Sequence, residues 1–171
     1  MMKTMEKAQV SLPSDTEVRV TRDFKAPRTL VWDAHTKPEL VRRWMLGPPG
    51  WSMPTCDMDV RPGGKYVWRW RSDETGAQFG FHGDYRDVAM PAKIVHAEYY
   101  DPGDIGGAMD ISQPAIIQTM FTEANGITSL EMIMTFASKD IRDAAVSTGM
   151  TDGMEMGYER LDRMFAEQSG G

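Results

Sequence analysis

The sequence lacks the features of a secreted or membrane protein. Its one cysteine, Cys56, has no second cysteine with which to form an internal disulfide, as is usual for proteins of a reducing compartment. No apolar run approaches the roughly 18 residues that a membrane span needs. The first fifteen residues contain Lys3, Glu6 and Lys7 but no apolar stretch typical of a secretory signal. We therefore expect a cytoplasmic protein.

An excess of basic residues is also absent. The formal net charge is −6 and the pI is about 5.1, whereas binding to phosphate backbones needs a basic surface. We therefore expect no nucleic acid partner.

The 171 residues fit a single domain with a real core. Pro13 interrupts a polar N-terminal stretch, so we expect a flexible arm over residues 1–16 and one domain over residues 17–168.

Motifs for metals or for nucleophilic catalysis are missing. His82 and His96 each precede a carboxylate by two positions, and adjacent strands would have to bring them together to hold a metal or to exchange protons. Nothing in the spacing demands this. His35 is expected as a cation near a helix end, and Cys56 as an inert strand residue. We assign no metal, no cofactor and no catalytic residue.

Alternating apolar and polar residues predict a strand over Glu17–Phe24. Pro27 and Pro38 then begin two short helices, because proline is tolerated in a first helical turn. Asn125-Gly126 is a strong two-residue hairpin signal. Further strands are expected at Trp51–Val60, Lys65–Ser72, Gln78–Val88, Lys93–Tyr100, Ala115–Thr122 and Ile127–Phe136.

After Ser138 the apolar spacing becomes helical. A six-strand antiparallel run with a bare apolar face is marginal, so the long C-terminal helix must cover the sheet. Sheets twist and curl, and a strongly curled sheet gripping one helix leaves a space between them. The sequence therefore predicts an α+β fold with room for a cavity.

Gly149, Gly153 and Gly157 lie four residues apart in this C-terminal segment. Each glycine in a helix interior costs roughly 0.8–1 kcal/mol relative to alanine. Gly149 is expected as a cap or kink between a short helix, about 139–147, and the long helix. The other two would thin the long helix against the sheet, either to enlarge a cavity or to pack closely on Trp68 or Trp70.

Methionine is abundant, at 15 of 171 residues. Methionine side chains adapt to irregular space. We therefore expect the methionines to fill a core, to line an apolar pocket or to form a protein-binding face. The aromatic rows on two neighbouring strands suit either a thick core or a pocket. A long loop, Asp101–Gln113, is rich in glycine and proline, which makes it a candidate lid.

Two polar residues, Arg22 and Glu98, share the parity of inward-facing strand positions. If both enter the cavity they could fix the head group of a polar ligand. The alternative is that Arg22 forms a structural ion pair at the sheet edge, because a buried arginine needs a carboxylate partner.

A set of short motifs follows in order along the chain: Val20-Thr21-Arg22-Asp23-Phe24-Lys25-Ala26-Pro27, Val31-Trp32-Asp33-Ala34, Arg43-Trp44, Met58-Asp59-Val60-Arg61-Pro62-Gly63-Gly64, Phe81-His82-Gly83-Asp84-Tyr85, Thr148-Gly149-Met150-Thr151-Asp152-Gly153 and Leu161-Asp162-Arg163. With these motifs the chain resembles the activator of heat-shock-protein ATPase homologue family, within the START-like (SRPBCC) helix-grip superfamily. Met45 and Met154 depart from the aromatic residues that many relatives carry there, which suggests a different cavity shape.

The resemblance implies a helix-grip fold, in which a curved antiparallel sheet of about six to seven strands wraps around the long C-terminal helix, with two short helices after the first strand. It also implies a choice of functions: binding of a small hydrophobic or amphipathic ligand, interaction with a chaperone in a stress response, or cyclase and hydratase chemistry. We expect the first, without catalysis, in a monomer or homodimer. The expected cavity lining is Trp44, Trp68, Trp70, Phe81, Tyr85, Glu98, Thr119, Met134, Met150, Gly153, Met154 and Gly157.

Overall fold

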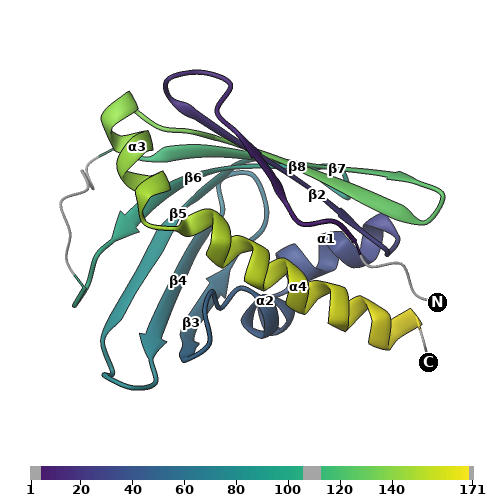
Figure 1. Ribbon diagram of the computed structural model, residues 1–171, viewed down its shortest axis with the longest axis horizontal. Helices are drawn as coiled ribbons and strands as arrows, with labels where there is room; N and C mark the ends of the chain where they lie inside the picture. Colours follow the sequence, from purple (N-terminus) through teal and green to yellow (C-terminus); the bar gives the residue numbers. More distant parts are fainter. Residues whose placement is uncertain (1–4, 106–112, 170–171) are drawn as a thin grey trace.

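A computed structural model describes residues 5–105 and 113–169 of the chain (Figure 1). One antiparallel sheet and four helices make up the described part. In chain order the elements are β1 (Gln9–Ser11), β2 (Glu17–Phe24), α1 (Arg28–Thr36), α2 (Pro38–Trp44), β3 (Trp51–Met58), β4 (Lys65–Ser72), β5 (Gln78–Ala89), β6 (Lys93–Asp101), β7 (Ala115–Ala124), β8 (Ile127–Thr135), α3 (Lys139–Ser147) and α4 (Met150–Ser169).

The sheet has eight strands in the order β1-β2-β8-β7-β6-β5-β4-β3, all paired antiparallel. The predicted α+β helix-grip architecture is confirmed, with a slightly higher strand count than expected. The additional strand is β1, which pairs with β2 from Gln9↔Thr21 to Ser11↔Arg19 and lies within the stretch expected to be an arm. Three residues are too few to show an alternating pattern, so periodicity does not reveal this strand.

The turn between β7 and β8 is the hairpin that Asn125-Gly126 predicts. Both residues have positive φ, 55° and 78°, as a two-residue type I′ turn requires. The break predicted at Gly149 is also confirmed, because its φ is +80° and it separates α3 from α4. A residue with a side chain would be strained in that conformation.

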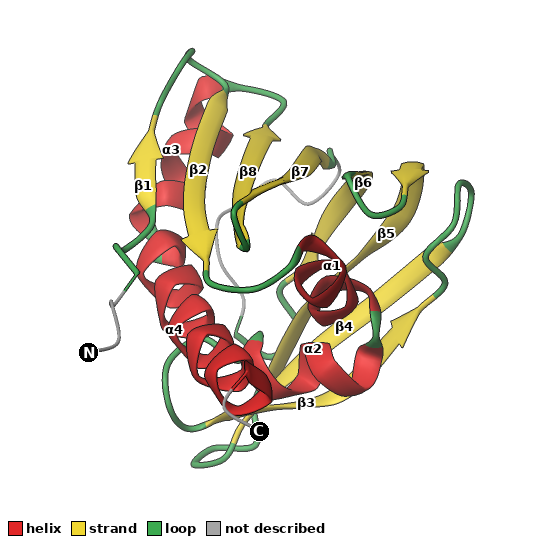
Figure 2. Ribbon diagram, turned by 90° about the vertical axis from the view of Figure 1, so that its right-hand side faces the viewer, coloured by secondary structure: helices red, strands yellow, loops and turns green. Residues whose placement is uncertain are grey.

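The sheet curls so that α1, α2 and α4 lie on its inner side (Figure 2). Helix α4 crosses the inner face diagonally, from the end of α3 toward the short helices (Figure 1). The core lies between the helices and the inward-facing side chains, of which Val18, Val20 and Phe24 on β2 are 0–1% exposed.

Helix α4 is divided into a packed half and a half that faces free space. In the part of the helix from Tyr158 onward, Tyr158, Leu161 and Phe165 are buried, and Phe24 lies edge-on to the rings of Tyr158 and Phe165 at centroid distances of 5.4 and 5.9 Å. The N-terminal half instead presents Gly153 and its neighbours to a cavity. The packed half therefore anchors the helix, and the other half lines the site described next.

Candidate functional site

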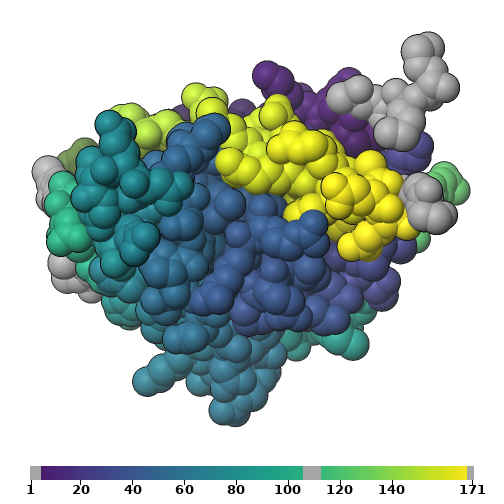
Figure 3. Space-filling view, turned by 90° about the horizontal axis from the view of Figure 1, so that it is seen from below, coloured from purple at the N-terminus to yellow at the C-terminus, as the bar shows by residue number. Residues whose placement is uncertain are grey.

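A cavity of about 830 Å³ lies between the inner face of the sheet, α1, α2 and the N-terminal half of α4. Its volume is within the range of roughly 300–1,000 Å³ that is usual for small-molecule sites. Figure 3 shows α4, in yellow, lying alongside the blue surface of α2 and the segment after it, which together close this side of the molecule. Every residue of the expected lining borders this cavity: Trp44, Trp68, Trp70, Phe81, Tyr85, Glu98, Thr119, Met134, Met150, Gly153, Met154 and Gly157.

The wall formed by β4 and β5 is aromatic. Trp68 pairs with Phe81 and Trp70 with Phe79 across the two strands, so all four side chains share the inner face. The rings of Trp70 and Phe79 are stacked with their centroids 5.4 Å apart. Aromatic pairs of this kind stabilise a sheet by up to about 1 kcal/mol each, so the same residues hold the sheet together and line the cavity.

Trp44 of α2 forms the wall opposite Gly157. Its indole N–H donates to the carbonyl of Ala34 at 2.7 Å, and its ring stacks on Tyr158 at 6.0 Å. The interpretation that the helix glycines pack on Trp68 or Trp70 is wrong for Gly157, since a Cβ there would lie 3.0 Å from the Trp44 backbone oxygen. A Cβ at Gly153 would meet only Gly47, at 3.9 Å. Of these two helix glycines, only Gly157 is therefore required for close packing.

Polar atoms without partners are concentrated at this cavity. Buried polar groups are nearly always hydrogen-bonded, because an unpaired one costs about 1–3 kcal/mol. In the described part of the chain, the buried side-chain atoms that lack a partner all belong to cavity-lining residues: His35 Nε2, Trp68 Nε1, the Tyr85 hydroxyl, and His96 Nδ1 and Nε2. The cavity is therefore apolar in most of its lining but holds unused hydrogen-bonding capacity.

Glu98 is the carboxylate of this lining. It lies on β6, its side chain is 18% exposed, and its Oε1 is 4.0 Å from Nε2 of His96. Burial raises the pKa of Glu98 to about 7 and lowers the pKa of His96 to about 4, because an apolar environment penalises the charged form of each. Near neutral pH the pair therefore combines a neutral imidazole with a carboxyl group that is close to its midpoint of ionisation.

His35 differs from its expected role. It lies near the end of α1, but burial lowers its pKa to about 4, so the prediction of a helix-end cation is wrong. Its Nδ1 is 2.8 Å from the Val31 carbonyl, and its ring lies between Trp44 and Phe121 at centroid distances of 4.9 and 5.1 Å. The helical spacing alone could not show that this end of α1 faces a cavity.

Arg22 does not reach the cavity with Glu98. It is 3% exposed and forms ion pairs with Glu155 at 2.9 Å and Asp162 at 2.8 Å, both on α4. Burial alone would lower the pKa of Arg22, but these hydrogen bonds outweigh it and raise the pKa. The structural alternative for Arg22 is therefore confirmed, and the interpretation that it fixes a head group is wrong.

The two strand histidines do not meet. His82 pairs with Tyr99 on β6 and stacks on its ring at 5.4 Å, whereas His96 pairs with Tyr85. Histidine, cysteine and carboxylate side chains form no group suited to a metal ion within residues 5–105 and 113–169. Cys56 is buried, and burial raises its pKa to about 11, so its thiol stays protonated as expected of an inert strand residue.

The expected lid, the loop Asp101–Gln113, is described only in part. Residues 106–112 of the loop Asp101–Gln113 lie outside the described residues. At its start, Asp101 accepts a hydrogen bond from Arg69 at 2.6 Å, which lowers the pKa of this carboxyl. Ile105 borders the cavity.

Among the described helices, none combines the length and apolar character of a membrane span.

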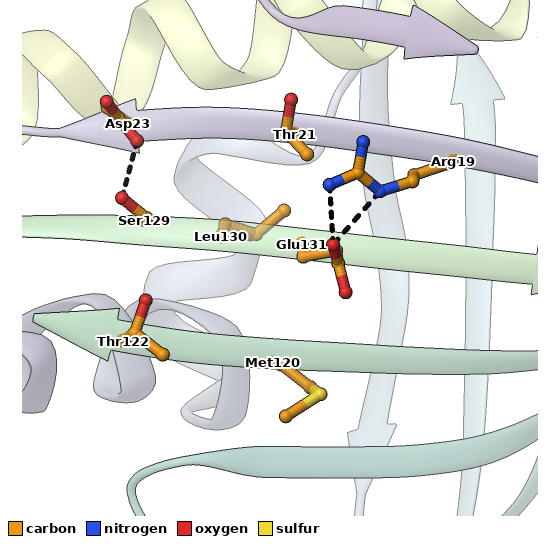
Figure 4. Close-up of a pocket in the computed structure, with 8 residues that line it drawn as sticks. All are labelled: Arg19, Thr21, Asp23, Met120, Thr122, Ser129, Leu130 and Glu131. Atoms are coloured by element: carbon orange, nitrogen blue, oxygen red, sulfur yellow. Dashed lines mark hydrogen bonds and ion pairs between the residues drawn. The ribbon is translucent and has the colours of Figure 1, made fainter.

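A second, smaller hollow of about 350 Å³ lies on the outer face of β2, β8 and β7 (Figure 4). Its charged side chains are already paired within the hollow. Arg19 donates to Glu131 at 2.7 Å, and the Ser129 hydroxyl donates to Asp23 at 2.7 Å. Because these groups satisfy each other, the hollow offers little to a ligand compared with the inner cavity.

Several lining residues were not anticipated. Phe79 shares its face with Phe81, and His96 shares its face with Glu98, so strand parity contained a usable signal for both. Leu46 and Pro48 come from the segment between α2 and β3. Such a segment has no periodicity, so its contribution depends on how the helices pack and is not visible in the sequence.

Sequence and structure comparisons now place the chain in a family. Residues 25–166 match the family model described as Activator of Hsp90 ATPase homolog 1-like protein. The chain belongs to this family. No curated protein shows a significant match to the chain.

Solved structures of bacterial proteins share the fold. A Rhodobacter sphaeroides protein is 26% identical, with a TM-score of 0.82 over 94% of this chain and 99% of its own. Protein Ms6760 of Mycobacterium smegmatis is 20% identical, with a TM-score of 0.78 over 94% and 96% of the two chains. CalU16 of Micromonospora echinospora is more distant, at 17% identity and a TM-score of 0.54 over 99% and 100% of the two chains. The family and the fold together support a module that binds a ligand or a partner.

Proposed function

We propose that this protein binds a small molecule with an apolar body and a polar head group in the inner cavity, without transforming it. The observation that carries the proposal is that all unpaired buried side-chain polar atoms of the described chain belong to residues that line the cavity of about 830 Å³. A ligand that donates or accepts hydrogen bonds there would remove a cost that the empty protein bears.

The makeup of the walls supports the same proposal. Met134, Met150 and Met154 border the cavity beside the aromatic wall, and methionine side chains adjust to ligands of different shape. Gly153 weakens α4 by roughly 0.8–1 kcal/mol relative to alanine, although a Cβ there would meet no close neighbour. Close packing therefore does not explain this glycine, whereas space for a ligand does.

Interaction with a chaperone, which the name of the family suggests, would be favoured by a large exposed apolar patch. The exposed large apolar side chains of the described residues are distributed over different elements and loops: Val10, Leu12, Val67, Met90, Ile105, Met120 and Met156. This distribution favours the cavity as the functional site.

The experiment compares wild type with Gly153→Leu, which fills the cavity, and with Asp152→Leu, which adds the same side chain at the neighbouring exposed position. Lipids, sterols, flavonoids and polyketides are screened by thermal shift and native mass spectrometry. Compounds that bind should stabilise wild type and Asp152→Leu but not Gly153→Leu. If no compound stabilises the protein, or if all three variants respond equally, the proposal is wrong.

A second candidate function is acid–base catalysis on the bound molecule, and the 4.0 Å separation of Glu98 and His96 favours it. A carboxyl with a pKa of about 7 can give and take protons near neutral pH. An isolated ligand that returns from the protein chemically changed, as in a dehydration or cyclisation, would support this function. Turnover should then disappear in Glu98→Gln while ligand binding remains.

A further inference from the structure

Near neutral pH, the charge that the described cavity lining can carry is negative. Its lining contains one carboxylate, Glu98, and among the described lining residues neither lysine nor arginine occurs. His35 and His96 are neutral near pH 7, because burial lowers the pKa of each to about 4. An anionic head group would therefore meet a carboxylate without any opposing cation.

The strand register surrounds Glu98 with aromatic rings. Gly83 is directly opposite Glu98 on β5, and Phe81 and Tyr85 are the next inward positions on either side of this glycine. Tyr100, opposite Phe81, is the next inward position on β6. The backbone of Ala97 and the hydroxyl of Tyr66 occupy the position over Gly83, whereas the rings of Phe81, Tyr85 and Tyr100 border the cavity with Glu98.

The acceptors in this region are unused. Within the described chain Glu98 accepts no hydrogen bond, and the Tyr85 hydroxyl and both nitrogens of His96 have no hydrogen-bond partner. A carboxylate accepts through both oxygens, a phenol oxygen accepts, and a neutral imidazole offers one acceptor nitrogen. Together they can receive the three N–H groups of a primary ammonium.

We propose that the ligand of the inner cavity is a lipophilic amine, bound as its ammonium ion against Glu98 and the rings of Phe81, Tyr85 and Tyr100. This inference rests on the proposed function and specifies its ligand class. An ammonium both pairs with the carboxylate and is attracted to aromatic faces. The apolar body of the amine occupies the volume between the aromatic wall and the methionines of α4.

The test uses three probes with the same apolar body: 2-naphthylmethylamine, 2-naphthylmethanol and 2-naphthoic acid. Their dissociation constants are measured by calorimetry at about pH 7.5, where the amine is protonated and the acid is ionised. Wild type should bind the amine about tenfold or more tightly than the alcohol, as expected for a charged hydrogen bond. The acid should bind more weakly than the alcohol.

Glu98→Gln retains the shape of the side chain and should remove the preference for the amine, because a neutral amide offers an ammonium ion no opposite charge. Glu167→Gln makes the same change at a 72% exposed side chain outside the cavity and should retain the preference. Equal binding of amine and alcohol by wild type, or a preference that persists in Glu98→Gln, would overturn the amine inference and leave ligand binding intact. Failure of all three probes to bind wild type would contradict both proposals.

Discussion

Gly157 packs directly on Trp44, whereas Gly153, one turn earlier in α4, packs on nothing closely. A Cβ at Gly157 would lie 3.0 Å from the Trp44 backbone oxygen and 3.2 Å from its ring, whereas a Cβ at Gly153 would be 3.9 Å from its nearest neighbour. The two glycines share one helix face, but the reason for the missing side chain differs between them. This difference leads to opposite predictions for the same substitution.

Gly153→Ala should raise the free energy of unfolding by about 0.5–1 kcal/mol, because alanine reduces the backbone entropy lost on helix formation. Gly157→Ala has the same intrinsic gain, but crowding against a backbone atom should make it destabilising by about 1–3 kcal/mol. Urea denaturation monitored by circular dichroism measures both values. Equal effects of the two substitutions would show that α4 does not contact Trp44 in this way.

Arg22 should be a major determinant of stability. Its guanidinium is nearly inaccessible, it pairs with Glu155 and Asp162, and it lies 5.1 Å from the centre of the Phe24 ring. Removal of one partner from a buried ion pair typically costs about 3–5 kcal/mol. We expect Arg22→Ala to reduce the free energy of unfolding by an amount toward the lower end of this range, since both carboxylates keep some access to water.

The control for this prediction is Arg19→Ala on the same strand. Arg19 also pairs with a carboxylate, Glu131, but its side chain is 43% exposed, and exposed pairs contribute about 0–1 kcal/mol. Urea midpoints of the two variants should therefore differ clearly. If Arg22→Ala were as mild as Arg19→Ala, the ion pairs could not be anchoring α4.

Sequence patterns predict most of this fold because its strands are half-buried. Alternation identifies Glu17–Phe24 and Lys65–Ser72 to the residue, since one face of each strand contacts the core and the other contacts water. The expected cavity lining depended on the same parity together with the family resemblance. Strand β1 was missed because three exposed residues have no such contrast.

It was harder to predict which residues contact each other between distant elements than to predict which face of a strand or helix a residue occupies. Parity shows that Arg22 points inward, but only the crossing of α4 over β2 selects Glu155 and Asp162 rather than Glu98. Likewise the spacing of α4 shows that Gly157 shares a face with Gly153, but not that α2 places Trp44 there. Such choices depend on helix packing, which a single sequence does not encode in any local pattern.

Tyr85 and Tyr66 should respond oppositely to loss of their hydroxyl groups. The Tyr66 hydroxyl donates to the Ala97 carbonyl at 2.9 Å, whereas the Tyr85 hydroxyl is buried without a partner. Tyr66→Phe should destabilise the ligand-free protein by about 1 kcal/mol or more, and Tyr85→Phe should be neutral or stabilising by up to about 1 kcal/mol. Thermal or urea unfolding of the two variants checks this. Marked destabilisation by Tyr85→Phe would indicate that its hydroxyl has a partner after all.

The free energy of unfolding of the ligand-free protein should depend on pH, because Glu98 and the two buried histidines change it in opposite directions. Glu98 has its pKa raised from 4.5 to about 7, so the folded state binds more protons than the unfolded state in this window and stability falls as pH rises through it. His35 and His96 have pKa values lowered from 6.5 to about 4. For them the unfolded state binds more protons, so their contribution rises with pH over that range.

The comparison of wild type with Glu98→Gln isolates the carboxyl group. His96 faces Glu98 from the same strand. Tyr66 on β4 and Tyr85 on β5 also face it, and burial raises the pKa of each tyrosine above its usual range. These groups remain in both proteins, so they largely cancel. The stability of Glu98→Gln relative to wild type should increase between pH 4.5 and pH 7 by on the order of 3 kcal/mol, since each pKa unit corresponds to 1.36 kcal/mol. Urea unfolding at intervals across this range measures the difference, with Glu167→Gln as a variant that removes a carboxyl with no burial cost to relieve. A difference that stays constant with pH would mean that Glu98 is not held in an apolar environment.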